Sequence, residues 1–121
     1  AIDLNGLKPI NDRMGHSAGD SLIRSTANHI IGMFAGECYR IGGDEFAVID
    51  TKLDEEAFRN AVAAAKENME QDGISVSVGV SWRGVDCSIK EQLDEADRQM
   101  YRAKAEFYSS RDHDRRKRGQ P

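Results

Sequence analysis

The chain has 121 residues, of which 39% are hydrophobic and 31% are charged, and its formal net charge is −4. This length predicts one domain, and this composition predicts a packed core rather than a disordered chain. The negative charge argues against nucleic acid as the main partner, and no apolar run approaches the roughly 18 residues of a membrane span.

Cysteine usage and the start of the chain bear on the cellular compartment. Cys38 and Cys87 are too few for a disulfide framework and lack the spacing of a metal site, so we expect reduced thiols in a cytoplasmic protein. Residues 1–15 lack the basic start and apolar middle of a signal peptide. Residues 1–4 read as a strand end without an initiator Met, so we also expect a fragment of a longer protein.

The first third of the chain predicts a strand end and two helices. After a turn at Asn5 and Gly6, a short helix is expected over residues 7–14, with Pro9 in its first turn, where proline is tolerated. Gly15 ends this helix, and Ser17 is the expected N-cap of a longer helix to about residue 35. The apolar positions of the longer helix follow helical spacing: Ile23, Ala27, Ile30, Ile31 and Phe34.

Residues 40–46 read Arg-Ile-Gly-Gly-Asp-Glu-Phe, between short apolar runs that predict strands over 38–41 and 46–49. This describes a tight hairpin whose Gly42 and Gly43 reach positive φ without steric cost and leave bare backbone for a ligand. The carboxylates of Asp44 and Glu45 beside it suit a divalent metal and a phosphate. An ordinary exposed hairpin with acidic side chains is the alternative.

The remaining elements are a helix, a strand and a second helix. A helix is expected over 54–70, with Phe58, Val62, Ala65 and Met69 on one face. Strict alternation of apolar and small polar residues predicts a strand over 74–82. Ser88 and Glu91 fit a capping box that opens the last helix. Its apolar residues predict core packing: Ile89, Leu93, Ala96, Met100, Ala103 and Phe107.

The order of these elements indicates the fold class. Helices and strands alternate irregularly around one hairpin, which predicts an α/β fold of the α+β sandwich type, with helices flanking a mixed sheet. We assign residues 1–108 to one domain and residues 109–121 to a basic C-terminal tail. The basic run from Arg111 to Arg118 reads as a solvated tail rather than a phosphate or partner site.

Three acids are candidates for a metal site. Asp3 ends the first predicted strand, so it meets Asp44 and Glu45 if that strand pairs beside the hairpin. Like charges about 4 Å apart repel by roughly 4 kcal/mol at an effective dielectric of about 20. A Mg²⁺ or Mn²⁺ ion, or a pair of such ions, turns this cost into a binding site whose coordination phosphate oxygens complete. Dispersal of the acids over the surface is the alternative.

Asn11 and Asp20 suit the edge of guanine, because a carboxylate accepts from N1–H and N2–H₂ while an amide donates to an acceptor. The alternatives are a turn role for Asn11 and a helix first-turn role for Asp20. His16 in the same segment is more often a structural hydrogen-bonding residue than a ligand. Lys104 lies beside the apolar face of the last helix, where it either reaches a phosphate or snorkels.

Five segments occur in a fixed order and spacing: Asp3-Leu4-Asn5-Gly6-Leu7-Lys8-Pro9-Ile10-Asn11-Asp12, Gly15-His16-Ser17-Ala18-Gly19-Asp20, Arg40-Ile41-Gly42-Gly43-Asp44-Glu45-Phe46, Ser77-Val78-Gly79-Val80-Ser81 and Ala96-Asp97-Arg98-Gln99-Met100-Tyr101-Arg102-Ala103-Lys104. Over nearly all of residues 1–108 the chain resembles the GGDEF family of diguanylate cyclases. The resemblance implies a palm-like sheet flanked by helices, as in nucleotidyl cyclases. It also implies that two GTP condense to cyclic di-GMP and pyrophosphate at the interface of an at least transient homodimer.

The same resemblance implies roles by position. Metal ligands would be Asp3, Asp44 and the backbone carbonyl of Leu4, and Asp44 with Glu45 would help to deprotonate the 3′-hydroxyl. Lys8 and Lys104 would meet phosphates, Asn11 and Asp20 would read guanine, His16 would border the substrate, and Gly42 and Gly43 would lie against the nucleotide.

The chain also departs from the family pattern. An opening helix and a Leu-Thr-Gly-Leu-x-Asn-Arg segment usually precede the first strand, and neither is in this sequence. Residues 33–36 replace the Arg-x-x-Asp of the family's inhibition site, so we do not expect product inhibition there. Tyr108 stands where a phosphate-binding arginine is common, and Arg111 is a candidate substitute.

Two other functions stay open beside the cyclase. One is a non-catalytic GTP-binding domain that regulates a fused partner, and the other is a related cyclase with a different cyclic product. An upstream sensory domain is the expected partner in the whole protein.

Overall fold

The computed structural model describes the backbone of residues 1–34 and 36–118, with side chains up to residue 111. Within this part, four strands form one sheet in the order β2-β3-β1-β4. The strands are β1 (Ile2–Leu4), β2 (Glu37–Arg40), β3 (Glu45–Ile49) and β4 (Val76–Val78). The helices are α1 (Leu7–Met14), α2 (His16–Met33), α3 (Glu55–Gln71) and α4 (Ile89–Arg118).

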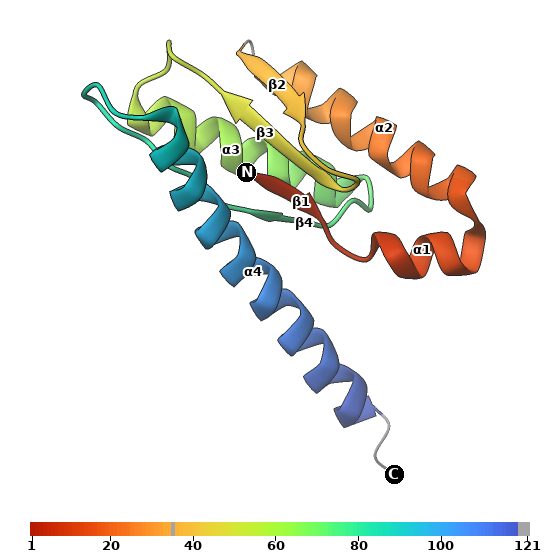
Figure 1. Ribbon diagram of the computed structural model, residues 1–121. Coiled ribbons are helices and arrows are strands. Elements are labelled where there is room, and N and C mark those ends of the chain that lie inside the picture. The colour runs from red at the N-terminus through yellow and green to blue at the C-terminus, as the bar shows by residue number, and fades with distance from the viewer. Residues whose placement is uncertain (35, 119–121) are drawn as a thin grey trace.

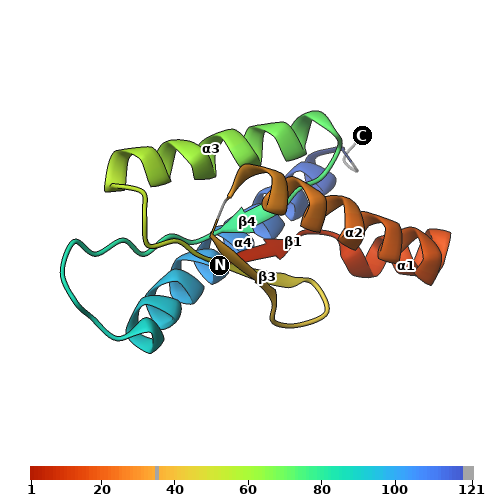
Figure 2. The same cartoon turned by 90° about the horizontal axis from the view of Figure 1, so that it is seen from above.

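Helices cover both faces of the sheet, which confirms the expected α/β sandwich fold (Figure 1, Figure 2). α2 and α3 lie on one face, while α4 crosses the other face and continues beyond the sheet. All three strand pairs in the described residues are antiparallel, so the sheet is not the mixed one we expected. The core under α2 and α3 includes Ile2, Leu4, Ile30, Phe46 and Met69, each no more than 5% exposed.

The boundaries of α1, α2 and α3 agree with the sequence to within a residue or two, with one error in capping. Asp54 caps α3, because its Oδ1 accepts a hydrogen bond from the Ala57 N–H at 2.8 Å. The expected N-cap role of Ser17 is wrong, since α2 begins at His16 and no side chain caps it. Gly15, with φ of +89°, ends α1 and directly precedes α2. Its positive φ turns the chain within one residue, so Gly15 alone serves as the C-cap of α1 and the N-cap of α2.

The strand predicted over residues 74–82 is shorter in the structure. β4 covers only Val76–Val78, whose partners in β1 run from Leu4 to Ile2. Alternation reports which face each side chain takes, whereas a strand also needs a neighbouring backbone to pair with. Gly79 still exchanges hydrogen bonds with Ala1, at 2.9 Å and 3.0 Å, and pairing in the described sheet ends there.

Two apolar residues expected in the core are exposed instead. Ile31 is 62% exposed, because Ile30 takes the core-facing position and successive residues of a helix lie about 100° apart. Ile89 is 57% exposed at the start of α4. The other core faces are confirmed by Met69 on α3 and Met100 on α4, which are 1% and 0% exposed.

The C-terminal region is helical where the sequence predicted a solvated tail. α4 continues to Arg118, so the backbone of the expected tail is helical as far as that residue, and its solvation stays a prediction. The assignment of residues 109–121 to a separate unit stays a prediction, and side chains after 111 lie outside the described ones. Among the described helices, none has the length and apolar character needed to cross a bilayer. Cys38 and Cys87 are free thiols.

Candidate active site

The sheet brings the predicted acids together at its centre. β1 lies between β3 and β4, and Asp3 stands opposite Glu45 in the ladder. The Leu4 N–H donates to the Asp44 carbonyl oxygen at 2.9 Å, so the end of β1 lies against the hairpin turn. Asp3 is only 5% exposed, although it carries a carboxylate. The pairing of β1 beside the hairpin, on which the metal site depends, is therefore present.

A lysine from the far end of the chain holds these groups together. The Lys104 Nζ lies 2.9 Å from Asp3 Oδ1 and 3.7 Å from Asp44 Oδ2, and it donates to the Leu4 carbonyl at 3.3 Å. Burial acts to lower the pKa of Lys104, but the two carboxylates outweigh it and the pKa is raised. Burial raises the pKa of Asp3, even though Lys104 acts to lower it.

The groups around the Lys104 ammonium are the three groups expected to bind metal. Two carboxylates and a carbonyl are hard oxygen ligands, which Mg²⁺ and Mn²⁺ prefer. Within the described residues, no group of three or more His, Cys, Asp or Glu side chains is arranged to hold a metal. The donor set of Asp3, Asp44 and Leu4 fits a cation that shares its coordination with a ligand, and the lysine ammonium supplies the positive charge in this structure.

Glu45 shares its surroundings with a residue that sequence analysis did not assign. Its pKa is raised to about 7 by burial, by a hydrogen bond with Asp97, and by the charges of Asp97 and Asp3. Asp97 lies on α4, seven positions before Lys104. Residues seven apart share one helix face, so the spacing to Lys104 is the signal that could have identified Asp97.

The hairpin turn is open, but not for the reason that the sequence suggested. Positive φ occurs at Gly6, Gly15 and Gly73 among the described glycines, so positive φ at Gly42 and Gly43 is wrong. A Cβ at either turn glycine would meet nothing within 4 Å. The Arg40 guanidinium shapes the turn by donating to the carbonyls of Gly42 and Gly43, at 3.1 Å and 2.9 Å.

The pair predicted for guanine lies where α1 packs on α2. Gly19 leaves room for the Asn11 side chain, since a Cβ there would overlap Asn11 Oδ1. This oxygen is buried without a hydrogen-bond partner among the described residues. Asp20, the next residue along α2, is exposed. Lys8 and His16 are exposed on the same two helices, and the structure does not join them to the acids.

The start of α1 faces the middle of α4. The Tyr108 hydroxyl accepts a hydrogen bond from the Gly6 N–H at 3.0 Å. Arg111 Nη1 lies 3.5 Å from the place that a Cβ at Gly6 would take. Lys104, Tyr108 and Arg111 thus follow one another along the face of α4 that runs from the acids to α1. Tyr108 takes a structural contact where an arginine was expected from the resemblance.

Comparisons with known proteins show the family of this chain. The family model described as "Diguanylate cyclase, GGDEF domain" matches residues 1–109. The chain is 30% identical over 111 residues to diguanylate cyclase DgcS of Shewanella oneidensis, and 32% identical over 119 residues to probable diguanylate cyclase DgcF of Escherichia coli. These matches cover 86% and 85% of this chain, but the chain spans only 38% and 25% of those proteins.

Solved structures show the same fold. The active GGEEF domain of a diguanylate cyclase from Vibrio cholerae has a TM-score of 0.75 at 25% identity, with 87% of this chain and 74% of that chain covered. The GGDEF domain of DgcB from Caulobacter crescentus, solved in complex with c-di-GMP, has a TM-score of 0.76 at 25% identity, with 86% and 69% covered.

Proposed function

The chain belongs to the GGDEF domain family, and from this premise we propose that it is a diguanylate cyclase domain that condenses two GTP into cyclic di-GMP with release of pyrophosphate. The observation that carries the proposal is the meeting of Asp3, Asp44 and the Leu4 carbonyl around one ammonium group. A site that balances two carboxylates with one lysine is ready to exchange that lysine for a cation and a polyphosphate.

In this proposal, Asp3, Asp44 and the Leu4 carbonyl hold Mg²⁺ or Mn²⁺. The ion, when bound, screens the charge of the triphosphate and polarises its phosphoryl oxygens. Lys104 turns from the carboxylates to the phosphate oxygens, so its charge stays balanced when a nucleotide enters. Lys8 adds a second positive charge at the phosphates.

The bond changes define what the acids must do. The 3′-hydroxyl oxygen of one GTP bonds to the α-phosphorus of the other, and the bond from that phosphorus to pyrophosphate breaks. The hydroxyl proton passes to a carboxylate, and a group with a pKa near the working pH suits this transfer. Glu45 and the adjacent Asp44 are the carboxylates placed to accept this proton, and burial and Asp97 raise the pKa of Glu45 before a cation binds. Two chains must face each other, because each nucleotide supplies both a nucleophile and a phosphate.

The remaining predicted residues select and hold the nucleotide. Asn11 and Asp20 read the guanine edge, and His16 borders it. Gly42 and Gly43 lie against the nucleotide, a role that their exposed and unobstructed backbone supports.

The test is product formation from GTP. The chain is incubated with GTP and Mg²⁺ over a wide range of protein concentrations, because the reaction needs two chains, and the product is identified by mass. We expect cyclic di-GMP, and we expect Asp44→Asn to lower the rate at least 100-fold, the order of a lost acid–base group. Glu56→Gln on the exposed start of α3 is the matched control. Absence of cyclic di-GMP at every concentration, or full activity of Asp44→Asn, would contradict the proposal.

The contact between Tyr108 and Gly6 supports a second candidate, a non-catalytic GTP-binding domain. The Tyr108 hydroxyl occupies an N–H at the start of α1, where an arginine would have offered charge to a phosphate. Tight GTP binding without any cyclic product would favour this candidate. In either case we propose that the domain acts in the cytoplasm, under an upstream sensory domain in the whole protein.

A further inference from the structure

The Arg40 side chain bonds twice to the turn between β2 and β3. Its Nε donates to the Gly42 carbonyl at 3.1 Å, and its Nη2 donates to the Gly43 carbonyl at 2.9 Å. These two nitrogens form one edge of the planar guanidinium group, which suits two neighbouring acceptors. Both bonds come from a charged donor, so they are stronger than bonds between neutral groups. Arg40 therefore fixes the orientation of two successive peptide groups.

Backbone hydrogen bonds close the ends of this turn but not its middle. The N–H groups of Ile41 and Gly42 both donate to the Glu45 carbonyl, at 2.9 Å and 3.4 Å. Among the hydrogen bonds of the described residues, none uses the N–H of Gly43 or Asp44. Neither turn glycine has the positive φ that fixes many tight hairpins. The guanidinium is therefore the group that holds the middle of the turn.

The same bonds set the direction of two N–H groups. A peptide group is planar, and in the trans form its N–H points opposite to its C=O. The peptide bonds of the described residues are all trans. The carbonyls of Gly42 and Gly43 point toward Arg40. The N–H groups of these two peptide groups, which belong to Gly43 and Asp44, therefore point away from it. Successive N–H groups that point the same way bind anions.

This N–H pair lies beside the acids of the candidate site, because Asp44 carries one of its two members. The Asp44 carboxylate lies 3.7 Å from the Lys104 ammonium. No ion pair of the described residues joins Arg40 to Asp44 or Glu45, so the guanidinium lies apart from the acids. The turn glycines are exposed, and a Cβ at either one would meet nothing within 4 Å. A phosphate bound at the acids can therefore reach the N–H pair.

We propose that Arg40 is a positioning residue for the cyclase reaction, which holds the turn so that the N–H groups of Gly43 and Asp44 bind a phosphate oxygen of GTP. This inference rests on the proposed function, because the phosphate is that of the GTP bound at the acids. Arg40 itself does not touch the nucleotide. It acts through the planar shape of its guanidinium, which a lysine cannot reproduce.

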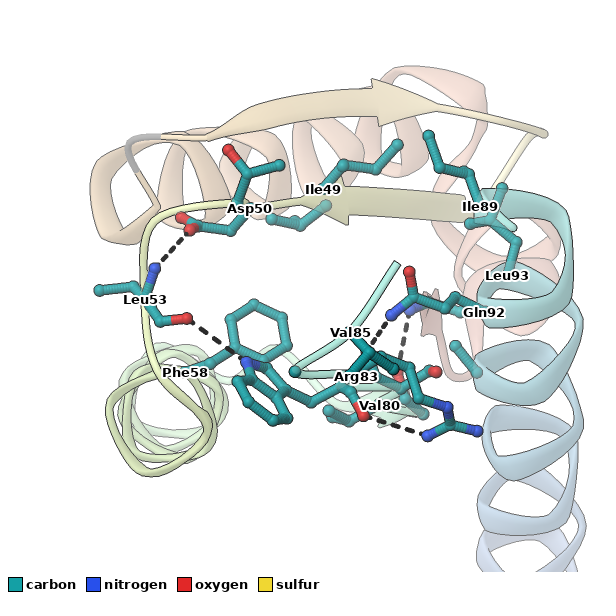
Figure 3. A pocket seen from close by; sticks show the side chains of 18 of the residues that line it. Ile49, Asp50, Leu53, Phe58, Val80, Arg83, Val85, Ile89, Gln92 and Leu93 are labelled. Atoms are coloured by element: carbon teal, nitrogen blue, oxygen red, sulfur yellow. Dashed lines mark hydrogen bonds between the residues drawn. The ribbon is translucent and has the colours of Figure 1, made fainter. Parts of the chain in front are cut away.

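The fold of an Arg40 variant can be monitored at a separate place. A cavity of about 760 Å³ lies between β3, the segment that follows β4, and the first turns of α4 (Figure 3). Its lining includes Ile49, Phe58 and Trp82, but none of residues 40–45. Trp82 is the only tryptophan of the chain, so its emission reports on the fold away from the turn. Substitutions at Arg40 should leave this emission unchanged.

The first test follows backbone amide signals by nuclear magnetic resonance. The probe is a GTP analogue with a methylene group between the α- and β-phosphorus, which cannot release pyrophosphate. With this analogue and Mg²⁺, the amide protons of Gly43 and Asp44 should move downfield in the natural chain, because donation to a phosphate oxygen deshields them. In Arg40→Lys these two signals should not move, and the affinity for the analogue should fall about tenfold. Arg59→Lys on the exposed face of α3 is the matched control and should behave like the natural chain.

The second test is turnover of GTP. Removing one donor to a developing charge costs about 100-fold in kcat, so misaligning two in Arg40→Lys or Arg40→Ala should cost about tenfold or more. Trp82 emission should stay that of the natural chain, and Arg59→Lys should keep its full kcat.

Three results would overturn the role of Arg40 and leave the cyclase proposal in place. They are an unchanged kcat in Arg40→Lys, unmoved amide signals of Gly43 and Asp44 in the natural chain saturated with the analogue, and the same downfield movement in Arg40→Lys as in the natural chain. If the natural chain makes no cyclic di-GMP, the proposed function fails instead, and the amide signals still decide whether Arg40 sets the turn.

Discussion

Removing the Lys104 side chain tests whether its ammonium offsets the charge of the buried acids. In Lys104→Ala, Asp3 keeps its carboxylate at 5% exposure but loses its partner at 2.9 Å. We expect the variant to be less stable than the natural chain at neutral pH. We also expect Mg²⁺ to restore part of the loss, because the acids and the Leu4 carbonyl then hold a cation without competition from the lysine.

The magnitude follows from burial. Leaving one member of a fully buried ion pair without its partner costs about 3–5 kcal/mol. Here the Lys104 side chain is 21% exposed and that of Asp44 is 40% exposed, so water screens part of the charge. We therefore expect a loss of about 2 kcal/mol at neutral pH. The loss should shrink in acid, because a protonated Asp3 no longer needs the ammonium.

The assay is urea unfolding followed by far-UV circular dichroism, at neutral and acidic pH and with and without Mg²⁺. Lys66→Ala is the matched control, because Lys66 is exposed on α3 and undergoes the same chemical change. Mass action predicts that a cation that binds only the folded chain raises the unfolding midpoint. The reasoning is refuted if Lys104→Ala unfolds at the same urea concentration as the natural chain at neutral pH.

Three other substitutions test separate parts of the structure. Burial and neighbouring carboxyls raise the pKa of Glu45 from 4.5 to about 7. Between pH 4.5 and about 7, the folded chain therefore keeps a proton that the unfolded chain releases, so the free energy of unfolding falls as the pH rises through this range. Glu45→Gln should remove about 1 kcal/mol of that fall, as measured by urea titrations at several pH values. A Cβ at Gly19 would overlap the Asn11 side chain and displace it. Gly19→Ala should therefore weaken GTP binding about tenfold, as measured by calorimetry. If Asn11 does not contact guanine, the affinity for GTP should not change. A Cβ at Gly79 would overlap the α4 backbone, so Gly79→Ala should lower stability by about 1–3 kcal/mol. Gly32→Ala is the control for both glycines, because its Cβ meets nothing within 4 Å. Alanine has a higher helix propensity than glycine, so this substitution should make α2 more stable.

Much of the fold could be predicted from short-range patterns. The spacing of apolar residues located α2, α3 and α4, and the Gly-Gly-Asp-Glu run located the hairpin between β2 and β3. These patterns depend on backbone geometry over a few residues, so they can be read without knowing what lies opposite. The errors arose where a neighbour decides the outcome. The strand predicted over residues 74–82 covers only Val76–Val78, the stretch whose backbone pairs with β1.

The candidate site divides in the same way. The residue types and their order indicated the acids, the guanine pair and Lys104, and the resemblance supplied their roles. Sequence could not show that Lys104 joins Asp3, about a hundred positions away, because that contact depends on how α4 crosses the sheet. It could not show the raised pKa of Glu45 either, because a pKa depends on burial and on charges brought close by folding.

By itself, the sequence determined which chemical groups the protein has and which local elements carry them, because those follow from side-chain identity and the repeat of helix and strand. Only the tertiary structure decided which carboxylates meet around the Lys104 ammonium and how far β4 pairs with β1. Both depend on distances between segments far apart in the chain, and electrostatic and backbone-pairing energies act only once those distances are short.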